Sequence, residues 1–423
     1  MRTMKDSGSE WIGMIPQEWE TQKLKYCVDL RLEKTADKSS PASYIGLEHV
    51  SSFTGTLCEN YEAITDFNGD TLDFRGGDVL FGKLRPYLAK AYQAKNAGRC
   101  SSEFWVMNPT GIDGRYLLYY VLSNGFISDI DHSTFGVKMP RAEWNYAGNE
   151  KIPLPPQKEQ FRIVSYLDTK CAEIDALITA KEKTNALLKE RRQSIIYEAV
   201  TKGLDPTAPM KDSGVEWIGE IPQRWEIAAL KRLGTPATGS TPSKDNADYW
   251  DGDIPWVSSK DMKSDYLLDS EDHITQAAVG ECGLTLFAPG ALIFCVRSGI
   301  LRHTFPVAVA TLPVTINQDL RALSLTGDIN PAFLLYYMRG MNNAIVSLYQ
   351  KIGATVESIE MDWFLYFPVV LPSREEQDRI VEALDSKCAS LDQTVKQNEA
   401  TIRQLKEYRQ SLVYEAVTGK IEI

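Results

Sequence analysis

Residues 154–177 read LPPQKEQFRIVSYLDTKCAEIDAL, and residues 371–394 read LPSREEQDRIVEALDSKCASLDQT, the same pattern 217 positions later. Prolines precede both stretches, and each continues for about 44 residues without Gly or Pro, over Gln157–Lys202 and Glu375–Thr418. Proline is favoured at a helix start and glycine just past its end. The two stretches therefore predict helices of unusual length, each about 65 Å long at 1.5 Å per residue.

One face of each predicted helix carries apolar residues at spacings of mostly three, four or seven, which is typical of a coiled-coil seam. Near the middle the seam turns polar, at Lys181/Asn398 and Thr184/Thr401, and polar seam residues fix the register of paired helices. The matched lengths and seams favour an antiparallel coiled coil over two unrelated amphipathic helices that each pack on their own domain. The seam positions that are apolar in both copies are Ile163/Ile380, Leu167/Leu384, Ile174/Leu391, Ile178/Val395, Leu188/Leu405 and Ile195/Leu412.

A second repeat begins each half of the chain: residues 4–20 read MKDSGSEWIGMIPQEWE, and residues 210–226 read MKDSGVEWIGEIPQRWE. The chain is therefore a tandem duplication in which a short motif, a variable block and a long helix occur twice. We expect a pseudo-two-fold axis between the halves, with antiparallel helices holding the variable blocks at opposite ends of a stiff spacer. The predicted segments are the repeat motifs 1–20 and 210–226, the variable blocks 21–151 and 227–368, and the helical spacers 152–209 and 369–423.

The variable blocks combine short β-rich runs with helical pieces, separated by Gly, Asn and Pro turns. The predicted fold class is α+β, with two mixed α/β domains separated by two long helices in an antiparallel coiled coil. The blocks resemble each other far less than the flanking repeats do, as expected if they recognise different things. Predicted strands lie at Asp78–Phe81, Phe104–Met107, Ala291–Val296 and Pro306–Ala310, and predicted helices lie near Tyr116–Asn124 and Pro331–Met338.

The composition is that of an ordinary globular protein, with 43% apolar and 24% charged residues among 423. Acidic residues outnumber basic ones, 57 against 46, which gives a net charge of −11. A free-standing DNA-binding domain usually has a basic excess, so binding to DNA would require local patches or a second, basic subunit. No apolar run approaches the ~20 residues of a membrane span, and there is no signal-peptide core or disulfide-like spacing among the seven Cys. We expect a cytoplasmic protein that makes no contact with membranes.

Motifs for catalysis and metal binding are missing from the sequence. Gly77–Lys83 fits the G-x-x-x-x-G-K pattern of a phosphate-binding loop, but Leu84 stands where a Ser or Thr would hold magnesium. Its interior, Val-Leu-Phe, favours a strand. The four His residues are scattered, and no nucleophile has an evident base beside it. We therefore expect no catalytic residue, no metal and no bound cofactor in this chain.

Polar and basic residues on Gly-rich loops are the remaining functional candidates. Ser, Thr, Lys and Arg on such loops contact phosphates, and Arg and Lys read base edges. Any one of them is more often a solvated side chain, but clusters in both blocks make DNA the leading ligand. The candidates are Lys83, Arg85, Tyr87, Lys90, Ser133, Thr134, Lys138 and Arg141 in the first block, and Thr238, Ser240, Thr241, Lys244, Ser258, Lys260 and Arg297 in the second.

The repeated tryptophans, Trp11/Trp217 and Trp19/Trp225, have two interpretations. They pack where each block meets the helices, or they form a docking surface for a partner subunit. Packing is favoured because Trp carries a large apolar surface. Cys171 and Cys388, which are matched at the 217-residue offset, are expected to be small buried residues of the coil and not reactive thiols.

Together these motifs resemble the specificity subunit of Type I restriction–modification systems, over essentially the whole chain. The resemblance rests on S-G-x-E-W-I-G-x-I-P-x-x-W, which occurs twice, and on G-D-V-L-F-x-K-x-R-P-Y-L at 77–88. It rests also on G-D-I-P-W-V at 252–257, N-Q-D-L-R-A at 317–322 and the duplicated L-P-x-x-x-E-Q-x-R-I-V. It implies two target-recognition domains that each read one half of a split, asymmetric DNA sequence, with the helices as the ruler for the gap.

The resemblance further implies that catalysis lies in other subunits. Modification subunits, expected as two per chain, methylate adenine N6 with S-adenosylmethionine, and restriction subunits translocate and cut DNA with ATP and Mg²⁺. Double-stranded DNA and these subunits are the expected partners, and the subunits would carry the acidic chain onto DNA. The first block has 15 basic against 16 acidic residues and the second has 10 against 15, so we expect the second block to bind DNA more weakly.

Two other classes of protein stay open at this point. A fused restriction–methylation enzyme would need a loop of the N-P-P-Y kind, and the nearest string in the sequence is N-P-T at 108–110. A DNA-independent coiled-coil scaffold, whose two blocks bind proteins, is slightly favoured by the acidic total. The salt dependence of binding would distinguish this scaffold from a DNA-binding protein. The family motifs outweigh both alternatives.

Overall fold

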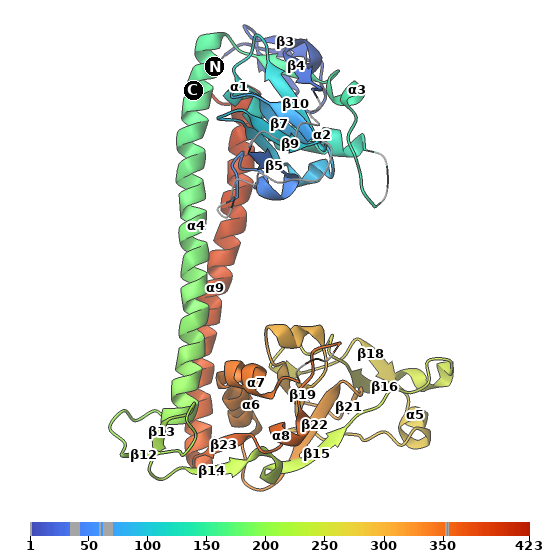
Figure 1. Cartoon of the computed structure of the whole chain (residues 1–423), viewed down its shortest axis with the longest axis vertical. Helices are drawn as coiled ribbons and strands as arrows, with labels where there is room; N and C mark the ends of the chain where they lie inside the picture. Colours follow the sequence, from blue (N-terminus) through green and yellow to red (C-terminus); the bar gives the residue numbers. More distant parts are fainter. Residues whose placement is uncertain are drawn as a thin grey trace. The chain divides into compact units, whose positions relative to one another are not determined.

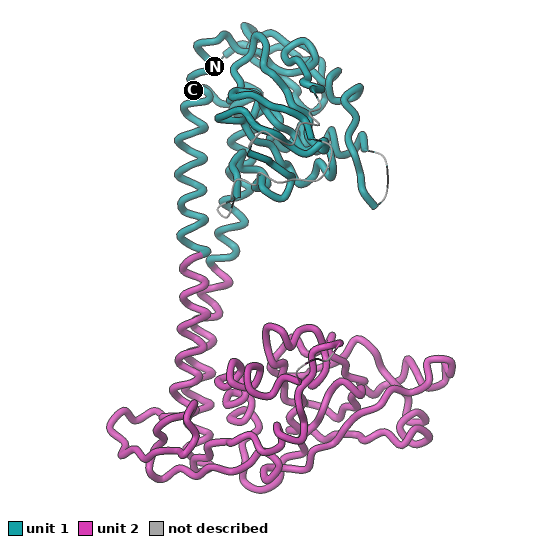
Figure 2. Tube along the Cα trace, in the orientation of Figure 1, with its two compact units in different colours: residues 1–182, 398–423 teal, residues 183–397 magenta. Residues whose placement is uncertain are grey.

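The structure, a computed structural model, describes residues 2–33, 43–58, 61, 71–134, 136, 138–351, 353 and 355–423. The chain divides into two compact units (Figure 2): unit 1 contains Met1–Glu182 and Asn398–Ile423, and unit 2 contains Lys183–Gln397. Each unit therefore holds one of the variable blocks and a stretch of each long helix. The block of unit 1 (21–151) is called head 1 below, and the block of unit 2 (227–368) is called head 2.

The two long helices are α4 (Gln157–Lys202) and α9 (Arg374–Val417), and their bounds confirm the prediction from the repeat (Figure 1). Beyond each helix lies a glycine in the left-handed region, Gly203 with φ +78° and Gly419 with φ +69°. A Cβ on either glycine would also lie close to a tryptophan, Trp225 in the first case and Trp19 in the second. Glycine adopts a positive φ without strain and leaves room for the indole ring. A glycine therefore follows the end of each helix, beside a tryptophan.

Within each unit, α4 and α9 pack against each other in antiparallel order. The first part of α4 and the last part of α9 share the core of unit 1, and the last part of α4 and the first part of α9 share that of unit 2. Lys181 Nζ donates to Asn398 Oδ1 at 3.0 Å, so the predicted polar position of the seam pairs across the two helices. Cys171 and Cys388 are buried in the seam, as predicted, and burial raises the pKa of both thiols.

Head 1 combines two β-sheets with short helices (Figure 1). Its strands are β4 (Val28–Arg31), β5 (Tyr44–Ile45), β6 (Thr71–Phe74), β7 (Val79–Gly82), β8 (Ala91–Gln93), β9 (Gly98–Ser101) and β10 (Phe104–Pro109), and its helices are α1 (Gly114–Val121), α2 (Asn124–His132) and α3 (Trp144–Ala147). The larger sheet is antiparallel in the order β4-β10-β7-β8, the smaller has the order β5-β9-β6, and α1 packs on the larger one. Because β7 occupies the interior of Gly77–Lys83, this segment is a buried strand, as predicted, and not a phosphate-binding loop.

Head 2 repeats this plan with a wider sheet. Its strands are β15 (Gly234–Thr238), β16 (Trp250–Val257), β17 (Tyr266–Leu267), β18 (Asp272–Ile274), β19 (Leu292–Cys295), β20 (Val307–Ala310), β21 (Thr315–Ile316) and β22 (Leu320–Leu325), and its helices are α5 (Gln276–Glu281), α6 (Pro331–Gly340), α7 (Asn342–Tyr349) and α8 (Met361–Phe364). The larger sheet has the order β15-β22-β19-β20-β17, the smaller has the order β18-β16-β21, and α6 packs on β19 and β20. The strands and helices predicted in both heads are thus confirmed.

Each unit also contains two short, two-stranded β-sheets next to its head. The bounds are β1 (Met4–Asp6), β2 (Met14–Pro16), β3 (Glu20–Lys23) and β11 (Lys151–Leu154) in unit 1, and β12 (Met210–Asp212), β13 (Glu220–Pro222), β14 (Glu226–Ala229) and β23 (Pro368–Leu371) in unit 2. β1 pairs with β2 and β12 with β13, so each repeat motif forms a hairpin. β3 pairs with β11 and β14 with β23, so the chain enters and leaves each head side by side.

The apolar core of each unit runs without interruption from the head into the helix pair. In unit 1 a single cluster of buried residues contains Phe81 of the sheet, Tyr116 of α1, Leu167 of α4 and Val413 of α9. In unit 2 the corresponding cluster joins head residues to Val200 of α4 and to residues of α9. Burial of apolar area is the main stabilising contribution to folding, so a head that shares its core with the helices is fixed to them.

Candidate nucleic-acid interface

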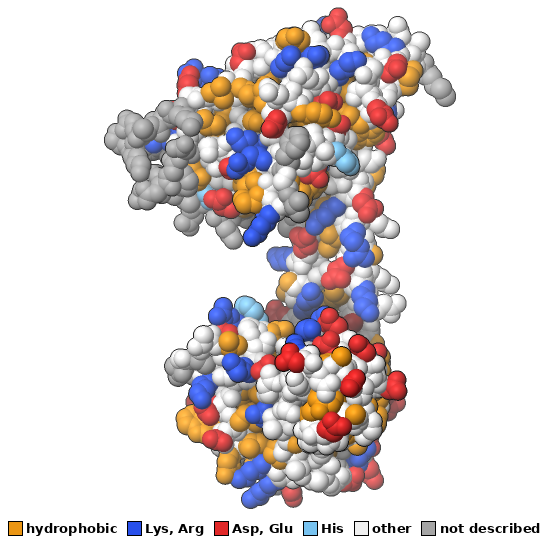
Figure 3. Space-filling model, turned by 90° about the vertical axis from the view of Figure 1, so that its right-hand side faces the viewer, with side chains coloured by type: hydrophobic (Ala, Val, Ile, Leu, Met, Phe, Trp, Pro, Cys, Tyr) orange, Lys and Arg blue, Asp and Glu red, His pale blue; other side chains and the backbone are white. Residues whose placement is uncertain are grey.

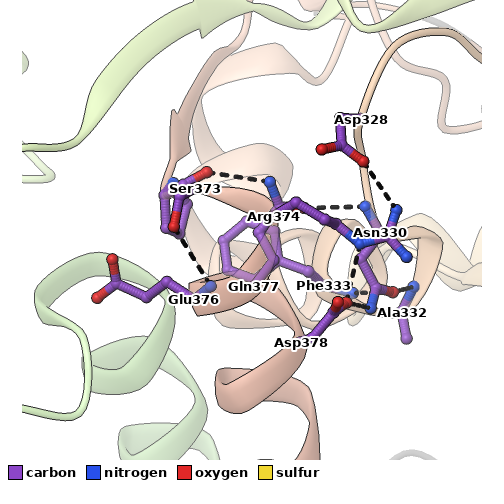
Figure 4. Close-up of polar contacts among 10 residues, drawn as sticks. Asp328, Asn330, Ala332, Phe333, Ser373, Arg374, Glu376, Gln377 and Asp378 are labelled. Carbon is purple, nitrogen blue, oxygen red and sulfur yellow. Dashed lines mark hydrogen bonds and ion pairs between the residues drawn. The ribbon is translucent and has the colours of Figure 1, made fainter.

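A network of side chains fixes α6 of head 2 to the start of α9 (Figure 4). Asn330 caps α6, because its Oδ1 accepts from the backbone N–H groups of Ala332 and Phe333 at 2.8 and 3.3 Å. Its own N–H donates to Gln377 Oε1 at 2.9 Å, and its Nδ2 donates to Asp378 at 2.6 Å. One residue therefore satisfies the free end of the short helix and connects it to the long one.

Unit 1 repeats this joint with matching geometry. Asp113 caps α1, and its N–H donates to Gln160 Oε1 on α4 at 2.8 Å. About two turns further along the long helix, Tyr119 donates to Asp168 Oδ1 at 2.6 Å, as Tyr336 does to Asp385 Oδ1 at 2.6 Å in unit 2. Burial raises the pKa of both phenols, so they remain protonated donors. The orientation of each sheet is thus set from the long helices.

The four repeated tryptophans take two kinds of position in the joints. Trp19 and Trp225 are each 1% exposed, and their indole N–H groups donate to Glu159 and Glu376, each at 3.0 Å. Trp11 packs against Tyr120 and Tyr414, while Trp217 is stacked on Phe367. All four therefore make packing contacts between head, repeat motif and helices, and a docking role for them stays a prediction.

The first group of candidate DNA-binding residues lies at one edge of the larger sheet of head 1. At the carboxyl end of β7, the backbone N–H of Lys83 donates to Glu103 O, and that of Arg85 donates to Pro140 O. The Arg141 guanidinium reaches the same place and donates to Glu103 Oε1 at 2.7 Å. Two loops that are far apart in the sequence, 83–90 and the end of 132–141, thus come together. Residues 135 and 137 of the second loop lie outside the described part of the chain.

The side chains at this edge are not equally available to a ligand. Arg85 and Tyr87 point outward, with Tyr87 45% exposed, and Lys138 is exposed as well. Lys90 Nζ instead donates to Leu47 O at 2.7 Å. The hydroxyl groups of Ser133 and Thr134 donate to backbone carbonyls of α2 at 2.7 and 2.8 Å. Arg85, Tyr87 and Lys138 are therefore accessible to a ligand. Lys90, Ser133 and Thr134 instead form hydrogen bonds within head 1.

Three loops that carry candidates of head 2 also come together, around the connection Asn317–Asp319 between β21 and β22. The N–H of Asn317 donates to the carbonyl of Val257, next to Ser258, and Arg297 N donates to Asp319 O. The hydroxyl of Thr241 donates to Gln318 Oε1 at 2.6 Å, which joins the loop 238–244 to the same connection. Three loops predicted separately from the sequence thus form one surface.

At this second edge, too, several candidates bind within the head. Ser258 is buried, and its hydroxyl donates to Asp261 at 2.9 Å. Lys260 forms ion pairs with Glu271 and Asp272 at 3.7 and 3.6 Å. The Thr238 hydroxyl donates to its neighbour's carbonyl, and Ser240 O accepts from the Trp256 indole. Lys244 and Arg297 are exposed.

Sequence reasoning missed two residues that the structure places among these loops, Gln318 in head 2 and Glu103 in head 1. Gln318 accepts the Thr241 hydrogen bond, and its backbone carbonyl accepts from Arg321. Glu103 accepts from Arg141 and thereby limits how freely that arginine can move. The string N-Q-D-L-R-A contains Gln318 and Arg321, so a signal was present as a motif without an assigned role.

Charge is mixed over the heads. On the face in Figure 3, Lys and Arg side chains lie among acidic and apolar ones and do not form one continuous basic field. Among the described residues, no group of His, Cys, Asp and Glu has the arrangement of a metal site. In the same part of the chain, no helix has the length and apolar character needed to cross a membrane.

Comparison with known proteins links this architecture to one family. The family model described as the Type I restriction modification DNA specificity domain matches residues 16–189 and 222–406. The EcoR124I/EcoR124II specificity subunit of Escherichia coli is 31% identical over 255 residues, 58% of this chain and 57% of that protein. The MjaIX specificity subunit of Methanocaldococcus jannaschii is 32% identical over 188 residues, 43% of this chain and 42% of that protein. The chain thus spans about half the length of these curated relatives.

Two solved structures share the fold. A chain from a structure of assembly and conformational transition in a type I R-M system has a TM-score of 0.76 at 20% identity and covers 96% of this chain and 99% of its own. The HsdS subunit of Thermoanaerobacter tengcongensis has a TM-score of 0.52 at 19% identity, over 96% and 98% of the two chains. At these identities the likeness concerns the fold alone.

Proposed function

The chain belongs to the Type I restriction–modification DNA specificity family, and from this premise we propose that it reads a bipartite, asymmetric DNA target, one half with each head. The observation that carries the proposal is the gathering of loops at one sheet edge in both units. The 83–90 loop meets the Arg141 loop in head 1, and three loops meet around Gln318 in head 2. An edge with exposed Arg, Tyr and amide groups has the chemistry that base recognition needs.

The exposed side chains at the two edges are suited to two kinds of DNA contact, with bases and with phosphates. Arg85 and Arg297 can donate two parallel hydrogen bonds to guanine. Gln318 can donate to adenine N7 through Nε2 and accept from adenine N6 through Oε1, which has a lone pair left beside its bond from Thr241. Lys138 and Lys244 are suited to phosphates, since a lysine acts there as a point charge. Base contacts specify the sequence and phosphate contacts position the head, so changes at the first group are expected to alter the motif.

The chemistry that follows recognition belongs, in this proposal, to partner subunits. This chain supplies no catalytic residue and binds no cofactor; modification subunits, two per chain, use S-adenosylmethionine to methylate adenine N6. Restriction subunits use ATP and Mg²⁺ to translocate and cut the DNA. The complex acts on double-stranded DNA in the cytoplasm.

The acidic balance of the chain fits a shared interface with DNA. Its net charge is −11, and the heads have 15 basic against 16 acidic and 10 against 15 residues. Release of counterions by Lys and Arg dominates non-specific affinity, so partner subunits supply most of the phosphate contacts. When one head is bound, the spacer holds the other head at a high effective concentration near its half-site. The overall affinity can therefore exceed that of either head alone.

A methylation map of DNA tests the proposal. The chain is co-expressed with its modification subunit, and modified adenines are located by single-molecule sequencing. We expect a split motif with two short specific halves, a fixed gap and a methylated adenine in each half. Exchange of head 1 for that of a relative should change one half only, and Arg85→Ala should relax that same half.

Other outcomes of this map would contradict the proposal. A continuous motif would mean that the heads do not act as two separated readers. A complex that forms but leaves all adenines unmodified would favour the DNA-independent scaffold. Binding of that scaffold to its protein partner should resist salt, whereas binding to DNA should weaken steeply with it.

A further inference from the structure

We infer that Arg409 is a positioning residue that couples the helix pair to the recognition loop of head 1. This inference rests on the proposed function, because it assigns a device to the edge that is proposed to read DNA. It concerns a series of hydrogen bonds that begins on α4 and ends at the loop that carries Arg85 and Tyr87. We call this series of bonds the head 1 relay, and its members are Asp175, Arg409, Phe53, Ala89 and the 3₁₀ turn η3 (Pro86–Leu88).

The first part of the relay centres on an arginine that is almost fully buried. Arg409 lies on α9 and is 6% exposed. Its Nε donates to Asp175 Oδ1 of α4 at 2.9 Å, which joins the two helices. Its Nη1 donates to Phe53 O at 2.8 Å, and its Nη2 lies 3.4 Å from Thr54 O. One guanidinium therefore holds both helices and a head loop, and its planar fork makes this geometry rigid.

The second part of the relay runs from this loop to η3. The N–H of Phe53 donates to Ala89 O at 2.9 Å, and the N–H of Ala89 donates to Pro86 O at 2.8 Å. A neighbouring bond strengthens the link, since Lys90 Nζ donates to Leu47 O at 2.7 Å. The loop around Phe53 is thus clamped between α9 on one side and the turn that presents Arg85 and Tyr87 on the other.

Backbone strain lies along the same path. Among the described residues, the non-glycine residues with positive φ are Phe53 at 63°, Arg85 at 52°, Ala89 at 45° and Asp251. The first three belong to the relay or to the loop that it supports. Such conformations persist only where surrounding contacts over-determine them, and they cluster at functional sites. Arg409 supplies contacts of that kind at Phe53.

The corresponding arginine of unit 2 makes a different contact with its head. Arg192 lies 217 positions before Arg409 and forms ion pairs with Asp392 of α9 at 3.3 Å and with Asp265 of head 2 at 3.9 Å. It thus meets a carboxylate of its head, whereas Arg409 meets two backbone carbonyls. Arg192 is therefore a matched control that tests an arginine at the same helix position without the head 1 relay.

Hydrogen–deuterium exchange of the full-length chain tests the coupling without DNA. In Arg409→Gln, we expect the amide of Phe53 and the hydrogen-bonded amides within residues 85–90, those of Arg85, Leu88 and Ala89, to exchange about tenfold faster or more, since a charged hydrogen-bond donor is lost. Amides of head 2 and of α4 should keep their rates. Arg192→Gln and Arg403→Gln, the latter on the exposed face of α9, should leave residues 85–90 unchanged. Unchanged exchange at residues 85–90 in Arg409→Gln, or an equal rise throughout unit 1, would overturn the inference.

A second variant covers the case in which Arg409→Gln does not fold. Arg409→Lys keeps a positive charge beside Asp175 but lacks the planar fork that donates to Phe53 O and Thr54 O, so the loop loses those two bonds. The same acceleration at residues 85–90 is expected. Asp175→Asn leaves the bonds from Arg409 to Phe53 and Thr54 in place, and it should accelerate those amides less than Arg409→Gln does.

The methylation map separates this inference from the proposed function. In the complex with modification subunits, Arg409→Gln should relax base preference in one half of the motif, and Arg192→Gln should leave that half intact. Equal loss in both halves would show a general structural role and contradict positioning. If the unaltered complex methylates no DNA while the exchange result holds, the proposed function fails and the coupling of Arg409 to the loop stands.

Discussion

Unit 1 and unit 2 share several hydrogen bonds between head and helix that match atom for atom. Tyr119 donates to Asp168 as Tyr336 donates to Asp385, each at 2.6 Å, and Gln160 accepts from Asp113 as Gln377 accepts from Asn330. The sheets beyond these joints differ, with β4-β10-β7-β8 in head 1 and β15-β22-β19-β20-β17 in head 2. The duplication has therefore kept the means of attachment, while the attached heads have diverged.

The sheet edges that carry the proposed recognition loops also combine shared backbone contacts with different side chains. The backbone frame is retained: Arg85 N donates to Pro140 O at 2.8 Å in head 1, and Ser298 N donates to Glu357 O at 3.0 Å in head 2. The side chains on that frame are not. Tyr87 is 45% exposed on η3, and Ile300 is 42% exposed on the corresponding turn η6 (Gly299–Arg302). The two heads thus present different exposed side chains on a shared frame, as the proposed reading of two different half-sites requires.

Truncation of the two buried tryptophans should destabilise the protein most. Trp19→Ala and Trp225→Ala should each lower the free energy of unfolding of their unit by about 3–5 kcal/mol, because each leaves a large cavity and a carboxylate without its indole donor. Trp363→Ala, at a tryptophan that is 69% exposed, is the control and should change stability little. The measurement is denaturant unfolding of the full chain, followed by hydrogen exchange that resolves the two units.

Unequal losses for the two buried tryptophans would show that the two joints differ in strength. Glu159 is buried and also pairs with Arg2, whereas Glu376 is half-buried. A larger loss in unit 1 would therefore show that this extra burial makes the loss of the indole donor more severe. A loss below about 1 kcal/mol in either unit would contradict the shared-core description of the joint.

A smaller effect is expected from the phenol groups of the joint. Tyr119→Phe and Tyr336→Phe each remove one hydrogen bond to a carboxylate, and we expect losses of about 1–2 kcal/mol in the free energy of unfolding. The losses should be similar because Asp168 keeps its ion pair with Arg115, and Asp385 is exposed to water. Tyr408→Phe, at an exposed tyrosine of α9, is the matched control. Losses that differ by more than about 1 kcal/mol would show that the two joints are not equivalent.

The parts of the fold that the sequence predicted are those encoded by local pattern or by repetition. The bounds of α4 and α9, the polar pair Lys181–Asn398 and the four predicted strands of the heads follow from spacing, turn residues and the offset of 217. The spacings and turn residues lie within windows of some tens of residues, and the repeat shows which two windows correspond. Patterns of this kind decide which segment forms which element.

What the sequence did not predict depends on partners that are distant in the chain. Arg409 looks like one more cation on a solvated helix face until the fold brings Phe53, 356 residues away, against it. Lys90 and Ser258 are residue types that contact DNA phosphates. In the structure, however, Lys90 donates to Leu47 O and the Ser258 hydroxyl donates to Asp261. Residue type limits what a side chain can do, but its partner decides what it does.

The smallest expected effect concerns a position where the units differ in polarity beside the same tryptophan. In unit 1, Glu150 lines a pocket of about 640 Å³ together with Trp11 and Asp129. At the corresponding position of unit 2, Phe367 is buried and its ring is stacked on Trp217. A partly buried carboxylate in one joint thus replaces an aromatic contact in the other.

The pKa of the Glu150 carboxyl is raised by burial and by the neighbouring Asp129, although Trp11 and Lys151 oppose this. The folded chain therefore binds this proton more tightly than the unfolded chain, so the charged form destabilises unit 1 above the raised pKa. We expect Glu150→Gln to be more stable than the unaltered chain at pH 7, by less than about 1 kcal/mol. As pH falls through the raised pKa toward about 4.3, the unaltered chain should gain stability relative to the variant. Unfolding of unit 1 between pH 8 and 4.5 checks this, with the exposed Glu143→Gln as control, and parallel stability curves would show that water already solvates the Glu150 charge in full.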